Sequence, residues 1–207
     1  MNQHFLKIIN GHDCEAQFQL ANALFEGEQM QKDDARALQL YERAAQLGHV
    51  DALNNAADMY LNGEGTAVNY HKARALFEEA ASRGVAEAYF TLAMMYETAL
   101  DVPYDAQRAL HYYEQAAALN DIEATYYLGM IYYEGLLHVT NDERKAKGFF
   151  GQAAAHGHVD ALFNCGYFYE HGIGCNQDVQ KAISFYSEAA LLGDEQAQKR
   201  AHALNML

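Results

Sequence analysis

Small and apolar residues recur along this chain with a period of 36 or 37 residues. One alanine opens each period, and a pair of adjacent alanines follows it in the second half of the period. The opening residues are Ala16, Ala52, Ala88, Ala124, Ala161 and Ala197, and the pairs begin at Ala44, Ala80, Ala116, Ala153 and Ala189. A fixed period of this length is the sequence signature of a repeat protein built from stacked helical units.

Each period contains the patterns of two helices. After the opening alanine, small or apolar residues occupy positions +1, +4, +5 and +8, which lie on one face of an α-helix. The second helix is predicted to begin at an aspartate or asparagine that caps the free backbone N–H groups, namely Asp33, Asn69, Asp105, Asp142 or Asp178. It is predicted to end at residues that favour the left-handed conformation, namely Gly48, Gly84, Asn120, Gly157 and Gly193.

Two irregularities interrupt the repeat. The single step of 37 residues arises between Gly135 and Lys145, where the pattern predicts a loop, so the inserted residue is expected to leave the helices intact. The third period has Ala99 and Asp101 where other periods have loop glycines, and the only proline, Pro103, follows them. We therefore expect the turn of the third period to differ in shape.

These residues resemble the Sel1-like repeat, a branch of the tetratricopeptide class of helical solenoids, and the clearest copies run from Ala52 to Gly84 and from Ala161 to Gly193. The resemblance implies an all-α fold, a right-handed α-α superhelix of about five 36-residue helix hairpins with half-repeat caps. We expect one solenoid over residues 1–207, with repeats near 13–49, 50–85, 86–121, 122–158 and 159–193 and with caps at 1–12 and 194–207.

The charge of the chain narrows the choice of partner. Its 28 acidic and 14 basic residues give a formal net charge of −14, which repels the phosphates of nucleic acids and of anionic membranes. We therefore expect neither nucleic acid nor a membrane as a partner. Three cysteines are too few for a disulfide framework, and the N-terminus lacks the pattern of a signal peptide, so the expected location is cytoplasmic.

The face of each first helix opposite its core is the candidate binding surface. Families resembling this one line their concave wall with the first helices, and here positions +2, +6 and +9 are unusually aromatic. We predict a groove over repeats three to five, with acidic residues at its edge. Its residues are Phe90, Met94, Glu97, Tyr126, Met130, Tyr133, Glu134, Phe163, Tyr167 and Glu170.

The groove has a competing interpretation, because neighbouring first helices could bury the same rings against one another. If the groove is open, its aromatic and acidic character suits a protein or peptide that carries basic and apolar anchor residues, bound through cation–π and aromatic contacts. If the groove is open, removing the rings should weaken partner binding and leave stability unchanged. If the rings are packed between helices, removing them should lower stability.

Candidate catalytic and metal-binding residues are few. His156 and His158 flank Gly157 like a metal-binding pair, but His158 has the repeat phase of His49, so both positions are expected to cover a helix end. Cys165 is expected in the core. The loops of Cys175, His171 and His138 could lie side by side and form a thiolate or metal site. The sequence otherwise predicts no catalytic residue, no metal ligand and no cofactor.

We therefore predict a non-catalytic protein-binding module, an adaptor or scaffold. Two alternatives remain open. One is an inhibitor, such as an immunity protein that occludes a basic toxin or enzyme, a role known among members resembling this fold and suited to a strongly acidic chain. The other is a hydrolase or metal enzyme that uses the His and Cys loops of the fifth repeat. The β-lactam binding linked to cysteine-rich relatives is not expected, because their paired-cysteine pattern is missing.

Overall fold

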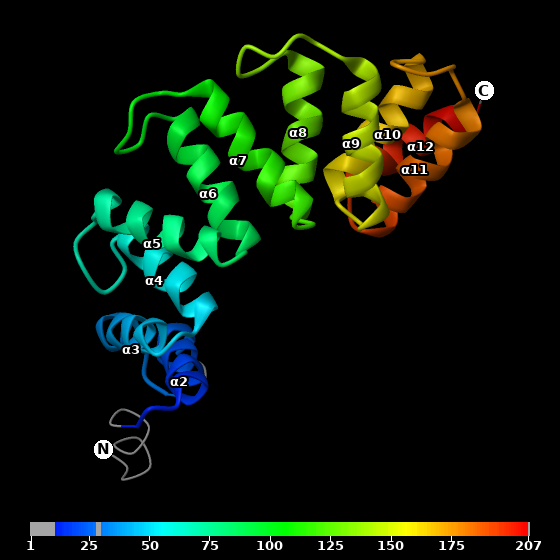
Figure 1. The fold of residues 1–207 in the computed structure, drawn as a ribbon. Coiled ribbons are helices and arrows are strands. Elements are labelled where there is room, and N and C mark those ends of the chain that lie inside the picture. The colour runs from blue at the N-terminus through cyan, green and yellow to red at the C-terminus, as the bar shows by residue number, and fades with distance from the viewer. Residues whose placement is uncertain (1–10, 28–29, 207) are drawn as a thin grey trace. The chain divides into compact units, whose positions relative to one another are not determined.

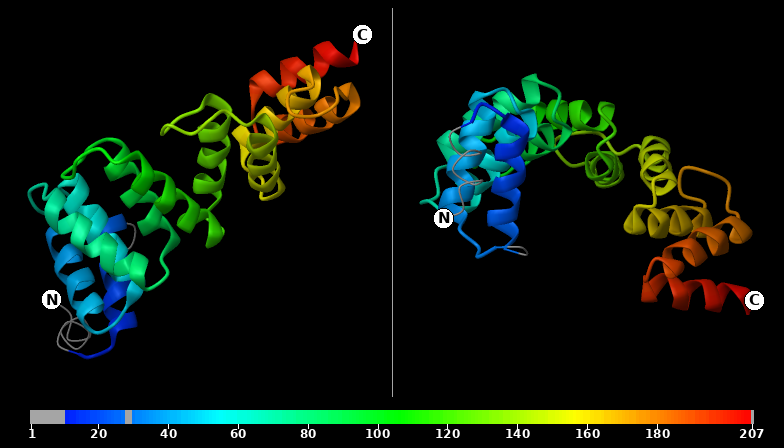
Figure 2. Two further views of the ribbon diagram at one scale, coloured as in Figure 1. Left: turned by 45° about the horizontal axis from the view of Figure 1, so that its top comes forward. Right: turned by 90° about the horizontal axis from the view of Figure 1, so that it is seen from below.

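The computed structural model describes residues 11–27 and 30–206, and every regular element within these ranges is an α-helix (Figure 1). The chain divides into two compact units, with the boundary between Tyr104 and Asp105. Within each unit, consecutive helices pack against one another (Figure 2). This arrangement agrees with the two helices predicted for each period.

The first unit contains five helices among its described residues. They are α2 (Cys14–Glu26), α3 (Asp34–Gln46), α4 (Val50–Asn62), α5 (Tyr70–Ser82) and α6 (Ala86–Glu97). The second unit contains six helices among its described residues. They are α7 (Ala106–Ala118), α8 (Ile122–Glu134), α9 (Glu143–Ala155), α10 (Val159–His171), α11 (Val179–Leu191) and α12 (Glu195–Asn205).

The second helix of each period is capped as the sequence predicts. The side chains of Asp33, Asn69, Asp105, Asp142 and Asp178 each accept a hydrogen bond from the backbone N–H three residues later. At the other end, Gly48, Gly84, Asn120, Gly157 and Gly193 all have positive φ angles. Asn120, with φ of 65°, confirms that asparagine replaces glycine at one of these termini.

The core consists of the small residues of the first helix and the aromatic ring of the second. The opening alanines from Ala52 onward are fully buried, as are the rings of Phe77, Tyr113, Phe150 and Tyr186. In the last two repeats glycine takes the place of alanine at +5. A Cβ atom on Gly129 would lie 2.6 Å from the Phe150 ring, so the ring rests directly on the helix backbone there.

The two irregular periods differ in how far the structure agrees with the prediction. The extra residue lies between α8 and α9, so both helices keep their length, as predicted. In the third period, Ala99 and Asp101 have φ angles of 56° and 60°, close to the 74° and 70° of Gly63 and Gly65. The prediction of a differently shaped turn is therefore wrong for these two φ angles, because the non-glycine residues adopt the left-handed conformation that glycine adopts elsewhere. The turn still differs at its start, because α6 ends at Glu97 with Thr98 as its C-cap, whereas α4 ends with the left-handed Gly63.

The predicted half-repeat caps are described only in part. Residues 1–10 of the N-terminal cap lie outside the described residues. At the other end, α12 begins after Asp194, whose carboxylate accepts hydrogen bonds from the N–H groups of Gln196 and Ala197. This helix packs against α11 through the buried side chains of Ala197 and Ala201. The prediction of one solenoid over the whole chain stays a prediction.

Candidate protein-binding surface

The predicted groove residues lie on three first helices. Helix α6 of the first unit carries Phe90, Met94 and Glu97, and helices α8 and α10 of the second unit carry the other seven residues. On α6, Met94 is 44% exposed, whereas Phe90 and Glu97 are half-buried. The two groups belong to different units.

On α8, the first aromatic residue is engaged in packing. The ring of Tyr126 stacks on His158, with centroids 4.3 Å apart and an interplanar angle of 18°, and it also contacts Phe150 at 5.7 Å. Burial, followed by the nearby charge of Asp160, raises the pKa of Tyr126. Through His158, which caps the start of α10, this ring connects α8 to the fifth repeat.

Farther along α8, the side chains are less enclosed. Tyr133 contacts the buried Phe168 at 5.0 Å, and burial together with the neighbouring Tyr167 raises the pKa of Tyr133. Met130 is half-buried against the core of the second unit, and Glu134 is exposed. No ion pair among the described residues includes Glu134.

On α10, the two predicted aromatic residues differ in their surroundings. Phe163 contacts the fully buried Tyr186 edge-on at 5.2 Å, so part of its ring serves the core. Tyr167 contacts His171, one turn along the same helix, at 4.4 Å, and the side chain of His171 is 40% exposed. Tyr167 is therefore the α10 ring whose contact leads toward the surface.

Glu170 has an internal role that the sequence analysis did not predict. It is only 9% exposed, and its carboxylate accepts hydrogen bonds from the Tyr186 hydroxyl at 2.8 Å and from the Arg200 guanidinium at 2.9 Å. These contacts join α10 to α11 and α12. Burial and the Glu170 carboxylate together raise the pKa of Tyr186. We therefore leave Glu170 out of the candidate surface.

Four of the predicted residues then form the candidate surface of the second unit, which we call the α8–α10 patch. It consists of Met130, Tyr133, Glu134 and Tyr167. The patch combines half-buried apolar side chains with one exposed carboxylate that has no ion-pair partner among the described residues. Such a combination suits an apolar anchor that lies beside a positive charge.

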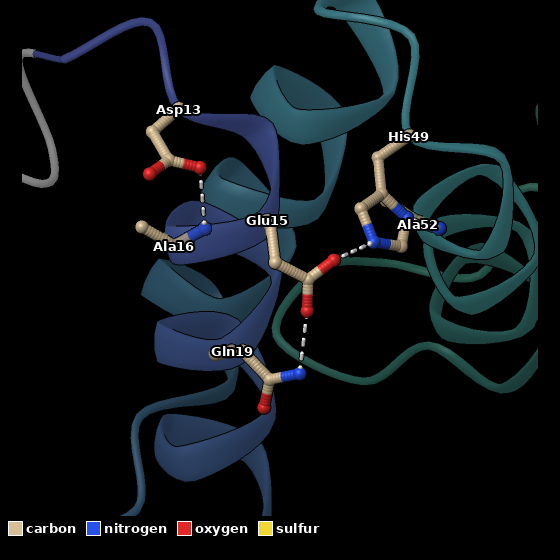
Figure 3. Close-up of polar contacts among 6 residues, drawn as sticks. All are labelled: Asp13, Glu15, Ala16, Gln19, His49 and Ala52. Carbon is tan, nitrogen blue, oxygen red and sulfur yellow. Dashed lines mark hydrogen bonds and ion pairs between the residues drawn. The ribbon is translucent and has the colours of Figure 1, made fainter.

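His49 and His158, which we call the junction histidines, each lie where one repeat meets the next. Their role was predicted only in part from the sequence. His49 accepts a hydrogen bond through Nδ1 from the Ala52 N–H at 3.3 Å, and it therefore covers the start of α4 as expected (Figure 3). Its Nε2 atom lies 3.1 Å from the Glu15 carboxylate, and its ring stacks on Phe18 at 4.0 Å. The side chain of His49 is 11% exposed.

The same arrangement recurs in the second unit. His158 accepts from the Ala161 N–H at 3.2 Å, lies 3.3 Å from Glu123 and stacks on Tyr126. In the first unit, the Glu15 carboxylate accepts hydrogen bonds from Gln19 and His49 (Figure 3). These bonds, that from Gln19 first, lower the pKa of Glu15. The sequence signal for these clusters is the triplet of a glutamate, an aromatic residue three positions later and a histidine one repeat farther along.

A wide, open cavity of about 680 Å³ lies between the start of α9 in the fourth repeat and the loop that follows α10 in the fifth repeat. Cys175 lines it together with residues that include Asp142, Glu143 and Arg144, whereas neither His138 nor His171 is among its lining residues. The Cys175 thiol lies 3.7 Å from the Phe168 carbonyl oxygen. Burial raises the pKa of the Cys165 thiol to about 12, as expected for a core cysteine.

Among the described residues, no group of three or more histidine, cysteine, aspartate or glutamate side chains is arranged to hold a metal ion. None of the helices described is long and apolar enough to cross a membrane.

A second cavity, which lies in the first unit, was not predicted from the sequence. This cavity, which we call the α2–α4 pocket, has a volume of about 320 Å³. Helix α2 contributes Asn22, Phe25 and Glu26, helix α4 contributes Asn55, Asp58 and Met59, and Tyr41 and Glu64 complete the wall. Its sequence signal is the polar pair Asn22 and Asp58 at position +6 of the first two repeats, where the later repeats have apolar residues.

Comparison with known proteins agrees with the repeat pattern. The sequence profile of the Sel1 repeat matches residues 14–49, 50–85, 86–121, 122–158 and 159–194. No match is found among curated proteins.

Solved structures give further similarities. A Sel1 repeat protein from Oxalobacter formigenes has 26% sequence identity and a TM-score of 0.85, with 91% of this chain and 76% of that chain covered. A protective antigen of uropathogenic Escherichia coli with an SLR fold has 28% identity and a TM-score of 0.86, with 96% of this chain but only 42% of that protein covered. An immunity protein from Pseudomonas aeruginosa has 19% identity and a TM-score of 0.57, with 93% and 81% covered, which is a likeness of fold.

Proposed function

Because this chain belongs to the Sel1 repeat family, whose members typically serve as protein-interaction modules, we propose that it is a non-catalytic adaptor or scaffold that binds a partner protein through the α8–α10 patch. The observation that carries the proposal is the exposed Glu134 carboxylate beside the half-buried Met130, Tyr133 and Tyr167. Three free cysteines agree with a reducing compartment, so the proposed setting is the cytoplasm.

The proposed partner carries an apolar anchor next to a lysine or arginine. Tyrosine rings contribute large contact areas at protein interfaces, and their faces attract cations. The net charge of −14 adds a long-range attraction for a basic partner, which increases the rate of association more than it increases the final affinity. The proposal therefore predicts that association slows as the salt concentration rises.

The test compares the captured proteins of three forms of the full chain. Tyr167→Ala removes a patch ring whose aromatic contact is with the partly exposed His171, and Tyr70→Ala is the matched control, because Tyr70 is 40% exposed on α5 and lies outside the patch. Tyr126→Ala is unsuitable as a binding variant, since that ring stacks on His158.

We expect at least one protein to be captured from lysate by the wild type and by Tyr70→Ala but lost with Tyr167→Ala. The purified partner should then bind Tyr167→Ala at least about tenfold more weakly, which is typical of a central interface residue. Glu134→Gln should slow association at low salt. Equal affinity of the wild type and Tyr167→Ala for every captured protein would refute the patch as the binding surface.

An inhibitory role is the second candidate, and the strongly acidic charge favours it. The fold likeness to an immunity protein is compatible with that role. The same capture experiment separates the two roles: a captured toxin or enzyme whose activity falls when this protein is added would identify an inhibitor, whereas a partner that keeps its activity would identify an adaptor.

A further inference from the structure

The α2–α4 pocket contains a half-buried negative charge without a counterion. The Asp58 carboxylate accepts one hydrogen bond, from the Asn54 amide at 3.1 Å. Its charged neighbours, Glu64 and Glu87, are also acidic. None of the ion pairs among the described residues of the first unit includes Asp58, Glu26 or Glu64. Carboxylates that leave water are normally paired with a cation, so this one is an exception.

The protein retains this charge at a cost to its own stability. Burial, followed by the nearby charges of Glu64 and Glu87, raises the pKa of Asp58 to about 6. A carboxylate in a cavity whose charged form is disfavoured by burial and by neighbouring acids is a feature of binding sites more often than of folding cores. The other acids of the repeat framework, such as Asp33 and Asp178, instead accept backbone hydrogen bonds at helix starts.

The remaining walls of the pocket suit a flat cation that has several hydrogen-bond donors. Phe25 contributes an aromatic ring, and the Lys32 ammonium lies 4.8 Å from its centroid, so the ring already takes part in a cation–π contact. Lys32 itself pairs with Asp34 at 3.4 Å rather than with a pocket acid. The amide oxygen of Asn22, which accepts from the Tyr41 hydroxyl at 2.6 Å, adds an acceptor beside the carboxylates.

The size of the cavity limits what can bind. A volume of about 320 Å³ lies at the lower end of the range of about 300–1,000 Å³ that is usual for ligand pockets, so the pocket suits one side chain rather than a large molecule. A guanidinium group has five donors in one plane and stacks on aromatic faces, whereas an ammonium group is a compact point charge. Several acceptors around one ring therefore favour arginine over lysine.

We propose that the α2–α4 pocket binds an arginine side chain of a partner protein. The proposal rests on the proposed function only in that the occupant belongs to a protein, because the pocket lies in the first unit and shares no residue with the α8–α10 patch. Guanidinium N–H groups would donate to the Asp58 carboxylate, with Glu26 and Glu64 at the rim and Phe25 against the face of the group.

The test uses N-acetyl-arginine-N-methylamide as the probe and the full chain labelled with ¹⁵N. We expect saturable shifts of the side-chain amide signals of Asn22 and Asn55. The citrulline analogue has the same shape without the charge, and it should bind at least about tenfold more weakly, because a hydrogen bond between charged groups is stronger than one between neutral groups.

Two variants complete the test. Asp58→Asn should also weaken arginine binding at least about tenfold, whereas Asp51→Asn should not change it, because Asp51 is exposed at the start of the same helix. Circular dichroism of both variants should match the wild type. Equal binding of the arginine and citrulline probes, or unchanged binding by Asp58→Asn, would overturn the proposal.

N-butylguanidine separates a side chain from a free small molecule. It carries the same single guanidinium charge but lacks the flanking peptide groups, so it should bind no more tightly than the arginine probe. Tighter binding of N-butylguanidine, by about tenfold or more, would assign the pocket to a free guanidino compound and overturn the assignment to a partner protein. None of these probes reports on the α8–α10 patch, so failure here would leave the test with Tyr167→Ala unaffected.

Discussion

The substitution Asp58→Asn is predicted to stabilise the protein at neutral pH. Asparagine has the shape of aspartate and keeps an oxygen to accept from Asn54, but it removes the half-buried charge. Folding raises the pKa of Asp58 from 3.8 to about 6, which corresponds to about 3 kcal/mol between the charged and neutral forms. At pH 7 the wild type bears this cost in full, and the variant does not.

The pH dependence follows from the direction of the shift. Because the folded pKa of this acid is higher than the unfolded pKa, protonation favours the native state, and the wild type loses stability as the pH rises from about 4 to about 6. The advantage of Asp58→Asn should therefore be about 1 kcal/mol at pH 4.5 and about 3 kcal/mol at pH 7. Above pH 7 it should remain constant.

Urea unfolding followed by circular dichroism at several pH values measures this difference. The dependence on urea should have the same slope in both proteins, so that a shift of the midpoint reports stability alone. Asp51→Asn, at an exposed position of the same helix, should change stability by less than about 0.5 kcal/mol at every pH. An Asp58→Asn protein that is no more stable than the wild type at pH 7, or whose advantage is independent of pH, would refute the unpaired charge.

Three further predictions concern packing and capping, each measured by the same unfolding assay. Gly129→Ala should destabilise the protein by about 1–3 kcal/mol, because its Cβ atom would lie 2.6 Å from Phe150, whereas Gly148→Ala on the open face of α9 should be neutral or stabilise the protein by up to about 1 kcal/mol. His158→Ala should cost about 1–2 kcal/mol, and His158→Asn should recover part of that loss, because asparagine can also cap α10. Glu170→Ala should cost about 1–3 kcal/mol, since it leaves a buried hydroxyl without its acceptor, and a loss below about 0.5 kcal/mol would contradict the internal role of this residue.

The repeat architecture could be predicted from the sequence because its signals are local. A cap such as Asp33 acts on a backbone group three residues away, and the glycine or asparagine at a helix end acts within one turn. The period of the opening alanines therefore located the helices and the inserted residue. The left-handed conformation of Ala99 could not be predicted from its residue type, because the framework around a turn can impose a conformation that the residue disfavours.

The candidate site was less predictable because it depends on contacts between repeats. Glu170 has the periodicity of a surface residue, but Arg200, 30 positions later, provides its ion pair. Tyr126 has the periodicity of a groove residue, but His158 of the next junction covers its ring. The α2–α4 pocket depends on side chains from two neighbouring repeats, so no single repeat reveals it.

The junction histidines also determine where the boundaries of a fragment of this chain should be placed. His49 and His158 lie at the ends of the first and fourth matched repeats, yet each caps the helix that opens the following repeat. A gene fragment that begins at Val159 would encode α10 without the side chain that accepts from the Ala161 N–H, whereas one that begins at His158 would retain it. The interchangeable segment of this protein is therefore offset by one residue from the repeat as family alignments define it, and grafts between such proteins should follow that offset.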